Sequence, residues 1–111
     1  MNIANFSPIV SNVTAPVIGP LTDRSNSLGI ASSITVASEN KSRGYFIFQN
    51  ISDAPMWLNF GAAATANNNS IYVAAQGSVL FNGSFIPNQE ITVLCPTASG
   101  GSTKRFIAKE G

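Results

Sequence analysis

Histidine is absent from this sequence of 111 residues, and a single cysteine, Cys95, is present. The commonest general base and the commonest transition-metal ligand are therefore missing, together with the side chain that ordinarily titrates near neutral pH. One cysteine cannot form a disulfide within the chain, so the fold has to be stabilised by burial alone. These absences weigh against an enzyme, a zinc site and a disulfide-stabilised scaffold.

Charge is scarce as well. Six Lys or Arg and five Asp or Glu leave a net charge of +1, and charged residues make up 10% of the chain, against ~25% in a typical soluble domain. Ser, Thr and Asn take their place. Because a nearly neutral surface with few charges favours association, we interpret this surface as one that lies against other protein. The alternative is the neutral, hydroxyl- and amide-coated surface of many extracellular β proteins.

Motifs that carry chemistry are missing too. No serine lies in a nucleophile elbow, the carboxylates are isolated, and Gly100–Lys104 lacks the spacing of a phosphate-binding loop. With one cysteine and no histidine, no metal-ligand pattern is found. We therefore expect a protein that is not an enzyme, with no catalytic, cofactor-binding or metal-binding residues.

A membrane, nucleic acid and a small-molecule substrate are not expected as partners. The N-terminus lacks the basic region and the uninterrupted apolar stretch of a secretory signal, and no apolar run approaches the ~20 residues that span a bilayer. Affinity for nucleic acid comes mainly from Lys and Arg, and here the cations are nearly cancelled by anions. We expect synthesis in a cytosol and neither a membrane nor a nucleic-acid partner.

Two parts of the chain differ in pattern. In residues 1–32, Pro8, Pro16 and Pro20 interrupt scattered apolar residues that show no helical period. This composition predicts an extended N-terminal arm, which has enough apolar side chains to need a surface, either its own domain or a neighbouring subunit. Residues 33–111 show short strand-like runs separated by turn residues and form the predicted folded domain.

The spacing of these runs predicts the fold class. Seven or so short strands at about ten-residue spacing indicate an all-β protein, a small antiparallel β-sandwich or barrel, immunoglobulin-like or jelly-roll-like. Asn82-Gly83 is the favoured pair for a type I′ turn and predicts a hairpin into a strand at 84–86. The alternation of apolar residues predicts a core made of Phe46, Phe48, Met56, Leu58, Phe60, Val79, Phe81, Ile91, Val93 and Phe106.

Trp57 stands on the strand face opposite Met56, Leu58 and Phe60. It is either part of a second core layer or an aromatic residue exposed at an interface or a sugar-binding platform. We favour the core position, because a sandwich has two faces to fill.

Several segments carry a family resemblance. The stretch FIFQNISDAPMWLNFGAAAT (46–65), the segments GSVLF (77–81) and FIP (85–87), and the terminal FIAKEG (106–111) resemble small virion proteins of tailed bacteriophages. The resemblance covers residues 43–111, and residues 1–42 match nothing of that kind.

The resemblance implies a viral structural protein, a capsid decoration or cement protein on the outside of a phage head in the virion, made in the bacterial cytoplasm. The implied partners are the major capsid protein and further copies of the chain, with a trimer favoured. A tail- or fibre-associated module that binds a receptor or glycan is the alternative, with Trp57 or Tyr72 as stacking platform. The interface residues expected for these roles are Ile3, Phe6, Ile9, Val13, Val17, Ile18, Trp57 and Tyr72.

Overall fold

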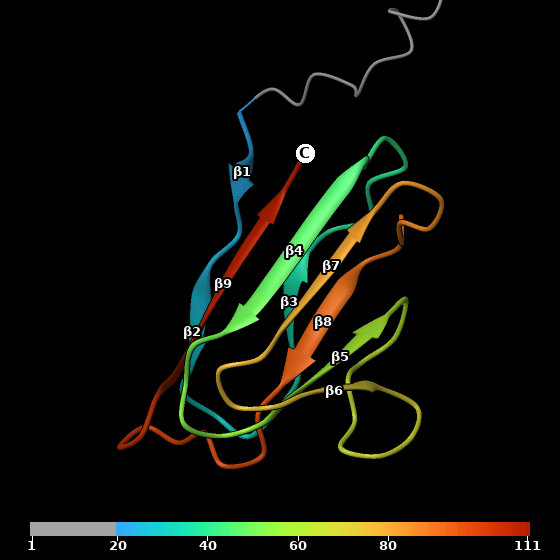
Figure 1. Cartoon of the computed structure of the whole chain (residues 1–111). Helices are drawn as coiled ribbons and strands as arrows, with labels where there is room; N and C mark the ends of the chain where they lie inside the picture. The colour runs from blue at the N-terminus through green and yellow to red at the C-terminus, as the bar shows by residue number, and fades with distance from the viewer. Residues whose placement is uncertain (1–19) are drawn as a thin grey trace, which may run out of the picture.

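Nine short β-strands form the part of the chain that the computed structural model describes, residues 20–111 (Figure 1). In this part no helix is long and apolar enough to cross a membrane. The strands are β1 (Thr22–Asp23), β2 (Asn26–Leu28), β3 (Ile34–Ala37), β4 (Tyr45–Asn50), β5 (Met56–Phe60), β6 (Ile71–Val73), β7 (Ser78–Asn82), β8 (Ile91–Leu94) and β9 (Lys104–Glu110).

The strands form two antiparallel sheets. One sheet has the order β1-β9-β4-β7, with β2 also paired to β9, and the other has the order β3-β8-β5-β6. The pairings are nested along the chain: β2 pairs with β9, β3 with β8, β4 with β7, and β5 with β6. This is the topology of a jelly roll, a long hairpin rolled into two facing sheets. The predicted all-β sandwich is confirmed, and its strand order is that of a jelly roll rather than that of an immunoglobulin domain.

The first described strands belong to this sandwich. β1 and β2 both pair with β9, with Thr22 opposite Glu110 and Leu28 opposite Lys104, and Leu28 is buried in the core. The last part of the predicted arm, 1–32, is therefore extended but lies within a sheet, so the division at residue 32 does not coincide with an edge of the fold. Residues 1–19 of the arm lie outside the described residues.

The core lies between the two sheets and follows the alternation of the strands. Of the ten predicted core residues, seven are fully buried, and Phe60, Val79 and Phe81 are partly buried and packed against them. Phe48 and Phe106 stack at 5.1 Å between ring centroids, and Phe60 meets Phe81 edge to face at 5.4 Å. The fully buried members of the predicted set are Phe46, Phe48, Met56, Leu58, Ile91, Val93 and Phe106.

The predicted hairpin at Asn82-Gly83 is wrong. A type I′ turn needs a positive φ at both central residues, here Asn82 and Gly83. Gly83 has φ +73°, but Asn82 lacks a positive φ, since Gln76 is the one non-glycine residue among those described that has one. Residues 84–86 form no strand. Instead, the chain after Gly83 crosses as a loop to β8 in the other sheet, where β8 is buried between β3 and β5, so no strand follows to pair with β7.

Candidate functional site

A buried ion pair closes one end of the sandwich. On β9, the residues that face the core alternate from Lys104 through Phe106 and Ala108 to Glu110. Arg43 lies just before β4, and its Nε donates to Glu110 Oε1 at 2.7 Å. The Arg43 side chain is 0% exposed and that of Glu110 is 4% exposed. Burying two charges is tolerated because each neutralises the other and both are hydrogen-bonded.

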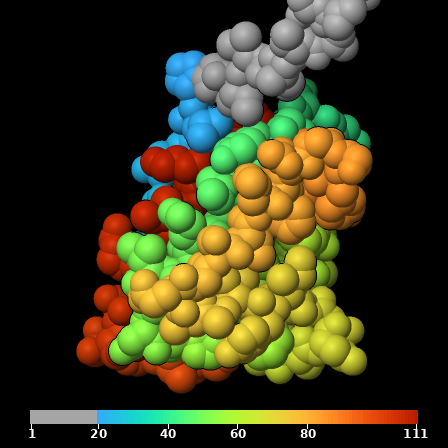
Figure 2. All heavy atoms as spheres, viewed as in Figure 1, coloured from blue at the N-terminus to red at the C-terminus, as the bar shows by residue number. Residues whose placement is uncertain are grey.

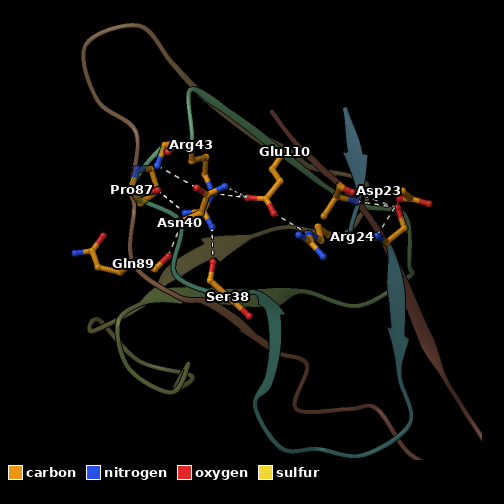
Figure 3. Close-up of polar contacts among 11 residues, drawn as sticks. Asp23, Arg24, Ser38, Asn40, Arg43, Pro87, Gln89 and Glu110 are labelled. Atoms are coloured by element: carbon orange, nitrogen blue, oxygen red, sulfur yellow. Dashed lines mark hydrogen bonds and ion pairs between the residues drawn. The ribbon is translucent and has the colours of Figure 1, made fainter. Parts of the chain in front are cut away.

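Arg43 also binds two neighbouring loops (Figure 3). Its Nη1 donates to the backbone carbonyls of Pro87 at 2.5 Å and Gln89 at 3.1 Å, and its Nη2 donates to the carbonyl of Ser38 at 2.8 Å. The planar guanidinium suits this role because its five N–H groups point in fixed directions. One side chain thus joins the loop after β3, the loop after β7 and the end of β9.

Arg24 completes the cluster from the N-terminal side. Its Nε donates to Glu110 Oε2 at 2.7 Å, and its backbone N–H donates to the carbonyl of Ala108 at 2.7 Å. Burial raises the pKa of Glu110, but hydrogen bonds from Arg43 and Arg24 outweigh it and hold that pKa below its ordinary value. The cluster therefore holds Arg24, which lies between β1 and β2, against the end of β9.

Asp23 lies beside this cluster at the surface. The side chain and backbone N–H of Ser25, together with Lys109, whose Nζ is 3.4 Å from Oδ1, lower the pKa of Asp23 to about 2. Asp23 and Glu110 thus each have a lowered pKa and a cationic neighbour, an arrangement suited to holding segments together rather than to proton transfer. Between Pro20 and Gly111, no group of three His, Cys, Asp or Glu could hold a metal ion.

A contrasting surface lies where both sheets end. Residues 54–89 contain no charged side chain, and this stretch includes β6 and β7, the terminal strands of the two sheets. We name residues 61–89 the neutral flank. Figure 2 shows them, coloured yellow to orange, as one continuous area of the facing surface.

The neutral flank exposes several large apolar side chains. Tyr72 on β6 is 55% exposed, Leu80 on β7 is 51% exposed, and Phe85 in the following loop is 62% exposed. Phe85 meets Phe81 edge to face at 5.9 Å between centroids, so aromatic packing continues from the core to the surface. Tyr72 and Leu80 lie on the outer faces of different sheets, because their strand neighbours Val73 and Phe81 pack on the core, so these exposed side chains border the sheet edges rather than form one patch.

Trp57 and Tyr72 lie opposite each other on β5 and β6, and their rings meet edge to face at 5.0 Å. Trp57 is partly buried but lies on the strand face opposite the core, so the favoured core position is wrong, and Tyr72 is exposed. The structure therefore brings together the two predicted interface residues that it describes. The other six, Ile3, Phe6, Ile9, Val13, Val17 and Ile18, lie outside the described residues.

Two features were not predicted from the sequence. Arg24, Arg43 and Glu110 are far apart along the chain and form no motif, so nothing local indicated their cluster. The neutral flank did leave a signal, the absence of charge from residues 54–89. The absence of charge indicates an uncharged surface only once the topology is known, because the topology places β6 and β7 at the edges of the two sheets.

No protein-family model, curated protein or solved structure matches the chain. The resemblance to bacteriophage virion proteins therefore stays a prediction.

Proposed function

We propose that the protein is a capsid decoration protein of a tailed bacteriophage, which binds the outside of the head and bridges neighbouring capsomers. Its partners are the major capsid protein and further copies of itself, arranged as a trimer. The resemblance of residues 43–111 to phage virion proteins supports this proposal. A low content of charge and the exposed apolar side chains of the neutral flank are consistent with a protein that acts by docking.

The anchoring of the N-terminal segment is the observation that carries the proposal. Residues 1–19 are uncharged apart from the terminus and include several Ile, Val and Phe residues. They join a chain that is held in the sheet by β1 and β2 and at Arg24 by the buried cluster. A load applied to residues 1–19 is therefore transmitted directly to the sandwich.

This arrangement suits the bridging of capsomers. Residues 1–19 contribute contacts to one capsid subunit, and the rigid sandwich rests on a neighbour. Each copy adds a modest interaction that is repeated over the particle, so the total resistance to expansion grows with copy number. Jelly rolls occur in viral capsid proteins but also in lectins and other proteins, so the fold alone does not assign this role.

A truncation tests the proposal, and the structure sets its limit. The deletion should remove residues 1–19 and stop there, because β1 and β2 pair with β9 and Leu28 is buried. We expect the truncated protein to stay folded, by circular dichroism and thermal unfolding, and to lose binding to phage heads stripped of the protein. Undiminished occupancy of those heads by the truncated form would contradict the proposal.

A matched pair of variants separates apolar contacts from mere length. Substitution of Ile3, Phe6 and Ile9 by serine removes apolar surface, whereas substitution of Asn2, Asn5 and Asn12 by serine changes only polar residues. We expect the first variant to lose most head binding and the second to keep it. Equal binding by both variants would show that the apolar side chains do not make the contact.

A glycan- or receptor-binding module is the second candidate function, favoured by the contact of Trp57 with the exposed Tyr72. Aromatic faces of this kind can stack on sugar rings. Because Trp57 is the only tryptophan, its fluorescence reports directly on this position during titration with host polysaccharide. A saturable change that Tyr72→Ala abolishes would favour this function, and an unresponsive signal would disfavour it.

A further inference from the structure

We infer that the neutral flank joins copies of this chain to one another, through the edge of β7 that pairs with no strand of residues 20–111 and through the apolar side chains beside it. The inference adds to the proposed function a contact that joins two copies of the chain and is separate from any contact that forms a trimer. It does not depend on the capsid as partner, and its test uses the purified protein alone.

The four sheet edges are protected unequally. An exposed strand edge presents unpaired N–H and C=O groups, and proteins prevent pairing there with charges, proline, bulges or interruptions. The edge formed by β1 and β2 is interrupted between two short strands and carries Asp23 and Arg24. The edge strand β3 has an irregular register between Thr35 and Ala37. Both protected edges lie away from the neutral flank.

The β7 edge of the neutral flank lacks these devices. β7 pairs with β4 in unbroken register from Ser78 to Asn82, without a bulge. The strand contains neither proline nor a charged residue, and Leu80 is exposed at its centre. β6 is shorter but also uncharged, with Ile71 and Tyr72 exposed. A regular, neutral and apolar edge of this kind is an association site.

The charge distribution favours a second copy as the occupant. When a surface binds an identical surface, each charge is brought close to charges of the same pattern, and any net charge on the surface repels. The neutral flank has none, because every charged residue of the chain lies outside residues 54–89. It therefore meets itself without repulsion. The edge of β7 supplies the matching backbone groups, since antiparallel strands exchange hydrogen bonds reciprocally.

A charge placed on β7 tests the inference. In Leu80→Lys, an exposed apolar side chain on the edge is replaced by the residue that most often blocks edge pairing. The control is Ile30→Lys, the same type of change at a side chain that is 57% exposed in the connection between β2 and β3. Analytical ultracentrifugation over a range of concentrations measures the association of each purified protein.

We expect the wild type and Ile30→Lys to sediment as dimers, because reciprocal antiparallel pairing of two β7 edges joins two copies. For Leu80→Lys we expect a dissociation constant raised at least about tenfold, because the burial of a leucine side chain is lost and a charge is introduced. A monomeric wild type at the highest soluble concentration overturns the inference. So does a Leu80→Lys protein that associates as strongly as the wild type.

Hydrogen exchange provides a test without any variant, should Leu80→Lys fail to fold. In the wild type, we expect the amides of β7 to exchange more slowly as protein concentration rises, while those of β2 are unaffected. Exchange in β7 that does not depend on concentration overturns the inference. Head binding is measured separately, so a self-associating protein that ignores heads refutes the capsid role alone.

Discussion

The substitution Glu110→Gln is expected to be the most destabilising change of a single charge in this protein. It keeps the shape of the side chain and removes its negative charge. Arg43, whose side chain is 0% exposed, is then left as a buried cation without its counter-ion. Its remaining acceptors are the backbone carbonyls of Ser38, Pro87 and Gln89, which carry only partial charges.

The magnitude follows from the burial of the pair. Loss of one partner from a buried ion pair costs ~3–5 kcal/mol, and the amide oxygen of glutamine still accepts one hydrogen bond, so the lower end applies. A loss of about 3 kcal/mol is a large part of the ~5–15 kcal/mol that stabilises a typical domain. In a domain of this size it lowers the melting temperature by roughly 12 °C or more.

Arg24→Gln is the matched control, because Arg24 binds the same carboxylate but its side chain is 42% exposed. Exposed ion pairs contribute about 1 kcal/mol or less. Calorimetry and urea unfolding of both variants measure the difference. Equal losses of stability in the two variants, or a wild-type melting temperature in Glu110→Gln, would refute the reasoning that burial sets the strength of this pair.

Two further predictions concern acid and the core. Burial raises the pKa of Glu110, but Arg43 and Arg24 hold it below its ordinary value. The stability that Glu110 confers is therefore complete above the ordinary glutamate range and is lost as pH falls through the lowered pKa. Urea unfolding at a series of pH values should show a smaller loss of unfolding free energy with acid in Glu110→Gln than in the wild type. Asn50 is fully buried, and its Nδ2 lies within hydrogen-bond distance of three carbonyl oxygens, so Asn50→Ala should cost about 3 kcal/mol. Asn59 is partly buried and donates to the carbonyl of Ala63 at an exposed position, so Asn59→Ala should cost under about 1 kcal/mol in the same unfolding assay.

The sequence predicted the strands well where alternation and turn residues agreed. Tyr45–Gln49 and Met56–Phe60 alternate between apolar residues on one face and mixed residues on the other, and both proved to be strands with their apolar face buried. At Asn82-Gly83 the local pattern was misleading, because the turn signal is present without a following strand to pair. The crossing of the chain from β7 to β8 in the other sheet decided that region.

For the candidate site, the sequence predicted Trp57 and Tyr72 as interface residues but not that they touch. Their contact depends on the register of β5 against β6, which places them directly opposite. The buried cluster could not be predicted from the sequence. It forms because β9 places Glu110 at the end of the sheet where Arg24 and Arg43 also lie.

By itself, the sequence determined which faces of the strands are apolar, how little charge the surface has and which stretch has none. These properties depend only on residues that are near each other in the sequence, because successive side chains of a strand point to opposite faces and an alternating pattern therefore shows which face is apolar. Only the tertiary structure decided the nested pairing of the strands, the burial of Arg43 against Glu110, and the position of β6 and β7 at open edges. Those outcomes depend on contacts between distant segments, such as Asn26 with Phe106, and the same local pattern is compatible with many such pairings.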